Sequence, residues 1–383
     1  MVWLVIGLIG LIAAAEYYSL TGLPRYISAK SRPSNRTSEP GVPFLLRTTL
    51  QNVSRLPATL LTVTERIPPA AHNAEHEQNG KEARLELDAT GSRLSYKTWL
   101  MPRQQLIKEI PMRIDTRGCY VFRGTSVYVG DFMGLKGSVR EFERHEEIVI
   151  YPEPLGGTEL KDTLGGYLGE ISVRRFILED PVLTIGLAEY TGREPMRAIN
   201  WKQTARSGRA MVNQYDHTTE LSAAVVLNLE YTARYEADRA LLERTLSCAR
   251  SVIEALEEKH IRYSFYSNLL TAGAVGDWLY VPEGLGAAHM HGILEGLGRS
   301  TLDTSESPAS LLDRVLRHAD QGRCCIIITP DGKKDGSLSG GAGSKAMTEP
   351  ERDIPALAAR ISERTGQSAM VLAVGEGAVT RWL

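Results

Sequence analysis

The sequence predicts a multi-domain protein of mixed α and β structure, with an N-terminal transmembrane helix, an immunoglobulin-like β-sandwich and a C-terminal α/β domain. Residues 1–15 carry no charge, residues 43–152 read as short strands, and residues after 222 alternate between strand-like and helix-like runs. A chain of 383 residues has room for this, since single cores rarely exceed about 250–300 residues. The predicted boundaries are 1–23 for the anchor, 24–42 for a linker, 43–155 for the sandwich, 156–222 for a signature segment and connection, and 223–383 for the α/β domain.

The apolar run MVWLVIGLIGLIAAA opens the chain, and Tyr17 and Tyr18 follow as interfacial aromatics. A spanning helix needs about 20 apolar residues. Basic residues then cluster at Arg25, Lys30, Arg32 and Arg36, which places that side in the cytoplasm by the positive-inside rule. We therefore expect residues 1–23 to cross the lipid bilayer once. A cleaved signal peptide or a buried core helix are the alternatives.

Composition narrows the class of protein further. The 44 basic and 46 acidic side chains give a net charge of −2, so no nucleic-acid-binding surface is predicted. The four cysteines, Cys119, Cys248, Cys324 and Cys325, form no C-x-x-C pair and no zinc spacing. Cys324 and Cys325 lie in the apolar run CCIIIT and read as part of a buried strand. Free core cysteines favour a reducing compartment, so the bulk of the protein is expected in the cytoplasm.

Residues 43–152 contain several strand-like runs with turn signals between them, a pattern typical of a β-sandwich. The expected strands are 44–49, 58–64, 84–88, 96–100, 105–114, 118–129 and 148–151, with a loop over 71–83.

After residue 222 the expected elements alternate as in a doubly wound, mainly parallel sheet. The expected strands are 223–229, 263–266, 278–281, 324–329 and 369–374, the last of these closing the sheet. The expected helices are 235–260, 286–297, 309–318 and 355–364.

The segment 187–215, LAEYTGREPMRAINWKQTARSGRAMVNQY, is the most distinctive stretch. Its charges and aromatics fit neither one helical face nor a linker. The residues that stand out are Glu189, Tyr190, Gly192, Arg197, Trp201, Lys202, Ala205 and Arg206. They resemble the signature of the bacterial domain-of-unknown-function family 58, roughly R-x-Y-x-x-G-D-x-x-R-x-I-x-W-x-x-x-A-R. Ala188 and Arg193 stand where that family usually has Arg and Asp.

A second piece is similar to the same family, because Arg117–Tyr120 and Asp131–Leu135 follow its R-G-x-Y and D-P-F-G-L motifs with two changes. The resemblance implies a C-terminal domain like that of von Willebrand factor type A. It also implies an anchor in the inner membrane of a bacterium. The implied partner is a MoxR-type AAA+ ATPase, acting in the assembly or maturation of envelope or secreted complexes.

Two interpretations of the signature remain open. Glu189, Arg197, Lys202 and Arg206 form a charge network around a buried Trp201 if the segment is a structural latch between the domains. The same residues form a binding surface if they bind an anionic or peptide partner. Paired charges more often serve architecture, so the latch is favoured.

No cofactor is expected, although one Mg²⁺ site needs consideration. Type A domains often bind Mg²⁺ through D-x-S-x-S after the first strand. Here the chain reads Asn228-Leu229-Glu230-Tyr231-Thr232, and only Glu230, Thr232 and the later Asp331 offer oxygen ligands. No nucleophile motif is present either. A scaffold protein is thus the leading hypothesis, ahead of a Mg²⁺-dependent binding module and a hydrolase.

Overall fold

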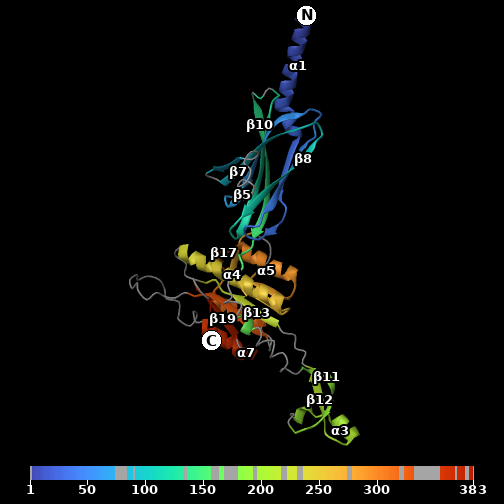
Figure 1. Ribbon diagram of the computed structural model, residues 1–383, viewed down its shortest axis with the longest axis vertical. Helices are drawn as coiled ribbons and strands as arrows, with labels where there is room; N and C mark the ends of the chain where they lie inside the picture. The colour runs from blue at the N-terminus through green and yellow to red at the C-terminus, as the bar shows by residue number, and fades with distance from the viewer. Residues whose placement is uncertain are drawn as a thin grey trace, which may run out of the picture. The chain divides into compact units, whose positions relative to one another are not determined.

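A computed structural model provides the structure of the chain, and Figure 1 shows its helices and strands. The chain divides into two compact units, Met1–Glu153 with Leu297–Arg299 and Pro154–Gly296 with Ser300–Leu383. The residues described are 2–73, 84–88, 91–132, 134, 136–156, 164–167, 180–192, 196–216, 222–230, 236–273, 278–318, 323–331, 354–366, 369–375 and 379–382.

The first unit begins with helix α1 (Val2–Thr21), which is apolar around its whole circumference. Its window Trp3–Thr21 has the length and composition of a membrane span, and only 6% of that window is buried. A helix that is apolar on every side and exposed to solvent needs an apolar medium around it. The exposure of α1 therefore argues against the alternative of a buried core helix.

Two sheets pack face to face to form the β-sandwich that the sequence predicts. The first sheet has the order β1 (Ile27–Pro33), β3 (Phe44–Asn52), β8 (Gln105–Ile114), β5 (Ala71–Asn73). The second has the order β2 (Thr37–Ser38), β10 (Gly137–Ile150), β9 (Gly118–Gly130), β4 (Ala58–Ile67), β7 (Gly91–Leu100), β6 (Arg84–Asp88). Inward-facing residues of both sheets form one core, with Leu46, Leu61 and Val127 fully buried.

The sandwich starts earlier in the chain than the sequence indicated. Within the range expected as a linker, 24–42, a 3-10 helix η1 (Leu23–Tyr26) leads into β1, and β1 pairs with β3 along its whole length. Leu23 is buried in the sandwich core. β1 was missed because Lys30 and Arg32 occupy outward positions. Of β10 only the end was expected, as 148–151, because residues 140–147 are mostly charged and none of them is buried. The expected loop at 71–83 begins with strand β5, and its remainder lies outside the described residues.

The second unit contains a doubly wound sheet, as predicted. Its order is β16 (Tyr280–Gly284), β14 (Arg262–Ser267), β13 (Ser222–Leu227), β18 (Cys324–Pro330), β19 (Ala369–Val374), β20 (Val379–Trp382). The four central strands are parallel, and the edge strands β16 and β20 are antiparallel to their neighbours. β20 lies beyond β19, which was expected to close the sheet. A separate antiparallel pair joins β15 (Leu269–Thr271) to β17 (Ser300–Thr304).

Helices cover both faces of this sheet, which explains why the central strands are apolar along their whole length. Helices α6 (Pro308–His318) and α7 (Ile354–Thr365) pack through residues such as Leu311 and Ile361 against one face. Helix α4 (Glu236–Glu258) packs on β13, β18 and β19, and α5 (Ala287–Arg299) bonds to β14 through His289. The chain order of the strands reverses between β13 and β18, and ligands of such sheets bind at the carboxyl ends of the strands there.

Candidate functional site

The signature segment folds as a β-hairpin that carries a short helix. Strands β11 (Asp180–Glu189) and β12 (Met211–Asp216) are antiparallel, and between them lie a 3-10 turn, η2 (Met196–Ala198), and α3 (Trp201–Ser207). Tyr190 continues the pairing, since its N–H donates to the carbonyl of Ala210 at 2.8 Å. Gly192 has φ of +86°, a conformation that favours glycine.

Hydrogen bonds from side chains fix α3 on β12. Asn200 caps the helix, because its Oδ1 accepts from the Gln203 N–H at 3.1 Å and its Nδ2 donates to Asn213 Oδ1 at 2.8 Å. Thr204 Oγ1 accepts from the Met211 N–H at 3.0 Å. Gly208 ends the helix at φ of +69°. The helix therefore has one orientation on the hairpin. Asn200 and Gln203 show the spacing of a capping pair, which is the sequence signal for this turn.

Trp201 is 66% exposed, so the expectation of a buried Trp201 inside a latch is wrong. The physical reason is that α3 has no buried residue, and a two-stranded hairpin offers no second layer in which to bury an indole. Met196, at 71% exposed, adds a second large apolar side chain to the same segment. An exposed indole and thioether are typical of contact surfaces rather than of cores.

The charges of this segment pair differently from the expected network. Glu189 Oε1 forms an ion pair with Arg209 at 2.7 Å. Arg209 lies outside the signature motif, and both side chains are largely exposed. An ion pair with this exposure contributes little to stability. Lys202 and Arg206 lie four residues apart on α3 and are exposed, as is Ala205. The side chain of Arg197 lies outside the described residues.

Two asparagine side chains, Asn228 and Asn268, lie at the carboxyl edge of the α/β sheet, near the point where the chain order of the strands reverses. Asn228, directly after β13, donates from Nδ2 to Thr329 Oγ1 at 3.1 Å. Its Oδ1 accepts from Asn268 Nδ2 at 2.8 Å, and Asn268 Oδ1 accepts from the Leu229 N–H at 2.9 Å. All three side chains are buried. These amides join the ends of β13, β14 and β18 through neutral hydrogen bonds. No motif in the sequence identified Asn268 as part of this cluster.

The residues considered for Mg²⁺ lie around this amide cluster. Glu230 donates its N–H to Asn228 Oδ1 at 3.1 Å, and Asp331 donates its N–H to the carbonyl of Val374 at 2.8 Å. Thr232 lies outside the described residues. Among the residues that the structure describes, no group of three or more His, Cys, Asp or Glu side chains has the arrangement of a metal site.

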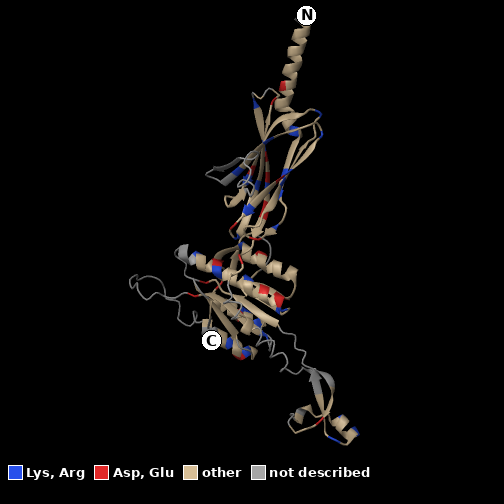
Figure 2. Cartoon of the chain, in the orientation of Figure 1, with Lys and Arg blue, Asp and Glu red and all other residues tan. Residues whose placement is uncertain are grey.

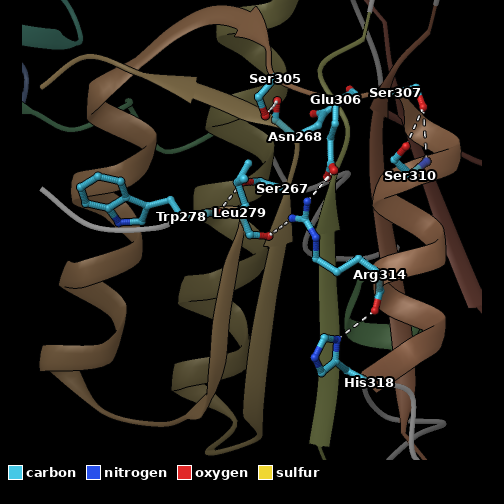
Figure 3. A network of polar contacts seen from close by, with 10 residues as sticks. All are labelled: Ser267, Asn268, Trp278, Leu279, Ser305, Glu306, Ser307, Ser310, Arg314 and His318. Carbon is cyan, nitrogen blue, oxygen red and sulfur yellow. Dashed lines mark hydrogen bonds and ion pairs between the residues drawn. The ribbon is translucent and has the colours of Figure 1, made fainter. Parts of the chain in front are cut away.

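A second polar network extends from this edge to α6 (Figure 3). Arg314 donates to the carbonyl of Leu279 at 2.9 Å and pairs with Glu306. Ser307 Oγ accepts from the Ser310 N–H at 3.3 Å and caps α6. The Ser305 N–H donates to the carbonyl of Asn268 at 2.9 Å. These bonds hold the loop before α6 against the end of β14, so the network fixes the backbone of that loop.

The cysteines of the α/β unit are poor candidates for nucleophiles. A small pocket is lined by Cys324 and Cys325 together with Tyr266 and His318. Burial, followed by the neighbouring Cys324, raises the pKa of Cys325 to about 12, and burial raises the pKa of Cys248 to about 12 as well. A thiol reacts as its thiolate, so neither residue is activated for catalysis.

A carboxyl group is buried inside the sandwich. Glu65 on β4 is 2% exposed and accepts hydrogen bonds from Thr48 Oγ1 on β3 and Thr125 Oγ1 on β9, both at 2.7 Å. Thr48 in turn lies 3.2 Å from Ser31 Oγ. Burial raises the pKa of Glu65 above its ordinary value, and the hydroxyl donors oppose that shift. The group links the two sheets.

The sequence matches no protein-family model and no curated protein. Among solved structures, it is similar to a non-cellulosomal cohesin from Archaeoglobus fulgidus, with 8% identity over 32% of this chain and 91% of that one at a TM-score of 0.22. It is similar to a CARDB domain from Pyrococcus furiosus, with 10% identity over 32% and 89% at 0.20. A Vibrio harveyi exo-β-N-acetylglucosaminidase matches with 8% identity over 64% and 47% at 0.22. TM-scores this low identify neither a family nor a function.

Proposed function

We propose that this chain is a membrane-anchored interaction protein that presents the signature hairpin to a protein partner. In this proposal α1 crosses the inner membrane once, and both compact units lie in the cytoplasm. The apolar, exposed α1 and the basic residues that follow it support the anchor. The buried or half-buried free cysteines are compatible with a reducing compartment.

The exposure of Trp201 is the observation that carries the proposal. Asn200 and Thr204 fix the helix that bears this indole, while nothing in the described residues buries it. Trp is among the side chains that contribute most to binding energy when a partner covers them. The same helix also exposes Lys202 and Arg206, which favour a partner surface that has acidic residues as well as an apolar recess.

The partner that we propose is a MoxR-type AAA+ ATPase, on the basis of the resemblance of the signature to family 58. The C-terminal unit is proposed to have the type A fold. In support, the sheet order is 3-2-1-4-5-6 when its strands are numbered along the chain, with an antiparallel third strand, β16. The sandwich is proposed to be immunoglobulin-like. Neither domain needs a metal for this role.

Co-purification with the ATPase from the same organism tests the proposal. We expect the full chain to retain the ATPase, and Trp201→Ala to lose it. The matched control is Trp99→Ala, since Trp99 is also exposed (56%) but lies on the sandwich. Both variants should keep a free energy of unfolding within about 0.5 kcal/mol of the parent, as for surface substitutions in general. Equal recovery of the ATPase with all three chains would refute the assignment of Trp201.

A further inference from the structure

The end of the sandwich that carries α1 also carries three loops rich in apolar and basic residues. The register shows this directly. Ile27 at the start of β1 pairs with Asn52 at the end of β3, and Gln51 pairs with Gln105 at the start of β8. In the second sheet, Leu61 near the start of β4 pairs with Val129 near the end of β9. The loops 53–57 and 101–104, and residues 131, 132, 134 and 136 between β9 and β10, therefore lie at the end where α1 joins the sandwich.

No spacer separates the helix from the sandwich. Only Gly22 lies between Thr21, which ends α1, and Leu23, which is 1% exposed in the sandwich core. Arg140 on β10 fixes the connection, because its Nη1 donates to the carbonyls of Pro24, Arg25 and Ile27 at 2.8, 2.9 and 3.0 Å. The loops around the connection are thus held close to the end of α1.

Helix length then places this end at the membrane surface. The 20 residues of α1 span about 30 Å at 1.5 Å per residue, which matches the hydrocarbon thickness of a bilayer. When α1 crosses a membrane, Thr21 lies at the interface. The sandwich begins at the next residues, so its α1 end lies within the headgroup region.

The side chains at this end fit such a position. Tyr26, Val53, Leu56 and Met101 are 45%, 56%, 37% and 52% exposed, although they are large and apolar. Arg25, Arg55, Arg103 and Lys136 are exposed beside them. The acidic residue of the three loops, Asp131, is buried and accepts from the Lys136 N–H at 2.9 Å. Figure 2 shows basic residues at the loop tips of this end.

The loops 53–57 and 101–104, which each connect one sheet to the other, form a fixed platform rather than independent tips. Asn52, fully buried, donates from Nδ2 to the carbonyls of Leu56 at 2.9 Å and Met101 at 3.1 Å. The Arg103 N–H donates to the carbonyl of Ser54 at 3.2 Å, and the Val53 N–H donates to the carbonyl of Tyr26 at 2.9 Å. The Asn52 amide thus holds the two loops together, and the backbone bond from Val53 to Tyr26 joins η1 to them.

We infer that this platform, residues 53–57 and 101–104 with Arg25 and Tyr26, is a second membrane-binding surface that inserts Val53, Leu56 and Met101 between anionic lipid headgroups. Transfer of apolar side chains from water to the interface is favourable, and basic residues near an anionic surface add electrostatic attraction. The inference rests on the proposed membrane anchor. It adds that the sandwich contacts the bilayer directly through this platform and is not attached to the membrane by α1 alone.

Depth-dependent quenching on the full chain tests this inference. A Val53→Cys variant carrying an NBD fluorophore is reconstituted into vesicles of phosphatidylcholine and phosphatidylglycerol that contain lipid with a nitroxide near the headgroup. Val42→Cys is the matched control, because Val42 is 48% exposed and lies in the loop before β3, at the other end of the sandwich. The parent chain, labelled in parallel, gives the background of the native cysteines.

We expect the Val53 probe to lose most of its fluorescence to the nitroxide and the Val42 probe to lose little. Vesicles without phosphatidylglycerol should reduce the quenching at Val53. Co-flotation of protein with vesicles but equal quenching at both positions would overturn the inference and leave the anchor intact. A chain that fails to co-float would overturn the anchor and the inference together. Unchanged quenching in neutral vesicles would overturn the role of the basic residues.

Discussion

Glu65 shows how a residue acquires its chemistry from its place in the fold. The alternation of β4 places Glu65 on the same face as Leu61, Val63 and Ile67, although the expected strand, 58–64, ended one residue before it. Its partners were not predictable, because Thr48 and Thr125 lie 17 and 60 residues away and on two other strands. The Asn228–Asn268 contact is of the same kind, since local sequence carries no signal for a pair 40 residues apart.

At this scale we predict that Glu65 makes stability depend on pH. Its pKa is raised in the folded chain, so the folded state holds the proton at pH values where the unfolded chain has lost it. This contribution to stability is complete below the ordinary pKa of 4.5 and is lost as pH rises through the folded pKa. Glu65→Gln cannot ionise. We therefore expect the free energy of unfolding of the parent, measured in urea, to fall relative to that of Glu65→Gln as the pH rises. Parallel curves of free energy against pH for the two proteins would contradict the prediction.

At the scale of elements, the strands that carry many charged residues were the hardest to predict from the sequence. β1 alternates buried residues with outward Lys and Arg, and it pairs with β3 rather than with the strand that follows it in the chain. The first part of β10 is mostly charged, and none of residues 137–147 is buried. The helices α4, α5 and α6 were predictable because their apolar stripes recur at helical spacing within one segment. The signature hairpin was not, since its strands pair around an inserted helix.

Asn200→Ala tests how α3 is held in place. The substitution removes the cap from the Gln203 N–H and the bond to Asn213, and loss of such a cap costs about 0.5–2 kcal/mol. We predict faster hydrogen exchange at the amides of α3, and weaker ATPase retention than in the parent. Ser207→Ala is the control, because it alters the other end of the same helix. Equal exchange in Asn200→Ala and the parent would show that the cap does not hold α3.

At the scale of the whole molecule, the junction of α1 with the sandwich decides how a soluble chain can be made. Leu23 belongs to the sandwich core, so a chain starting at Gly22 keeps the core intact and one starting at Pro24 does not. Loss of a buried leucine costs about 2–5 kcal/mol. We predict a lower melting temperature for the shorter chain in thermal unfolding. Identical melting curves would mean that Leu23 does not stabilise the sandwich.

The central claim is that α1 holds this protein in a membrane, and alkaline carbonate extraction of cell membranes tests it most directly. The full chain should stay in the membrane pellet with the mass of the unprocessed sequence, because about 20 apolar residues in hydrocarbon withstand extraction. The chain starting at Gly22 should be released. Release of the full chain, or a mature mass that lacks α1, would contradict the account.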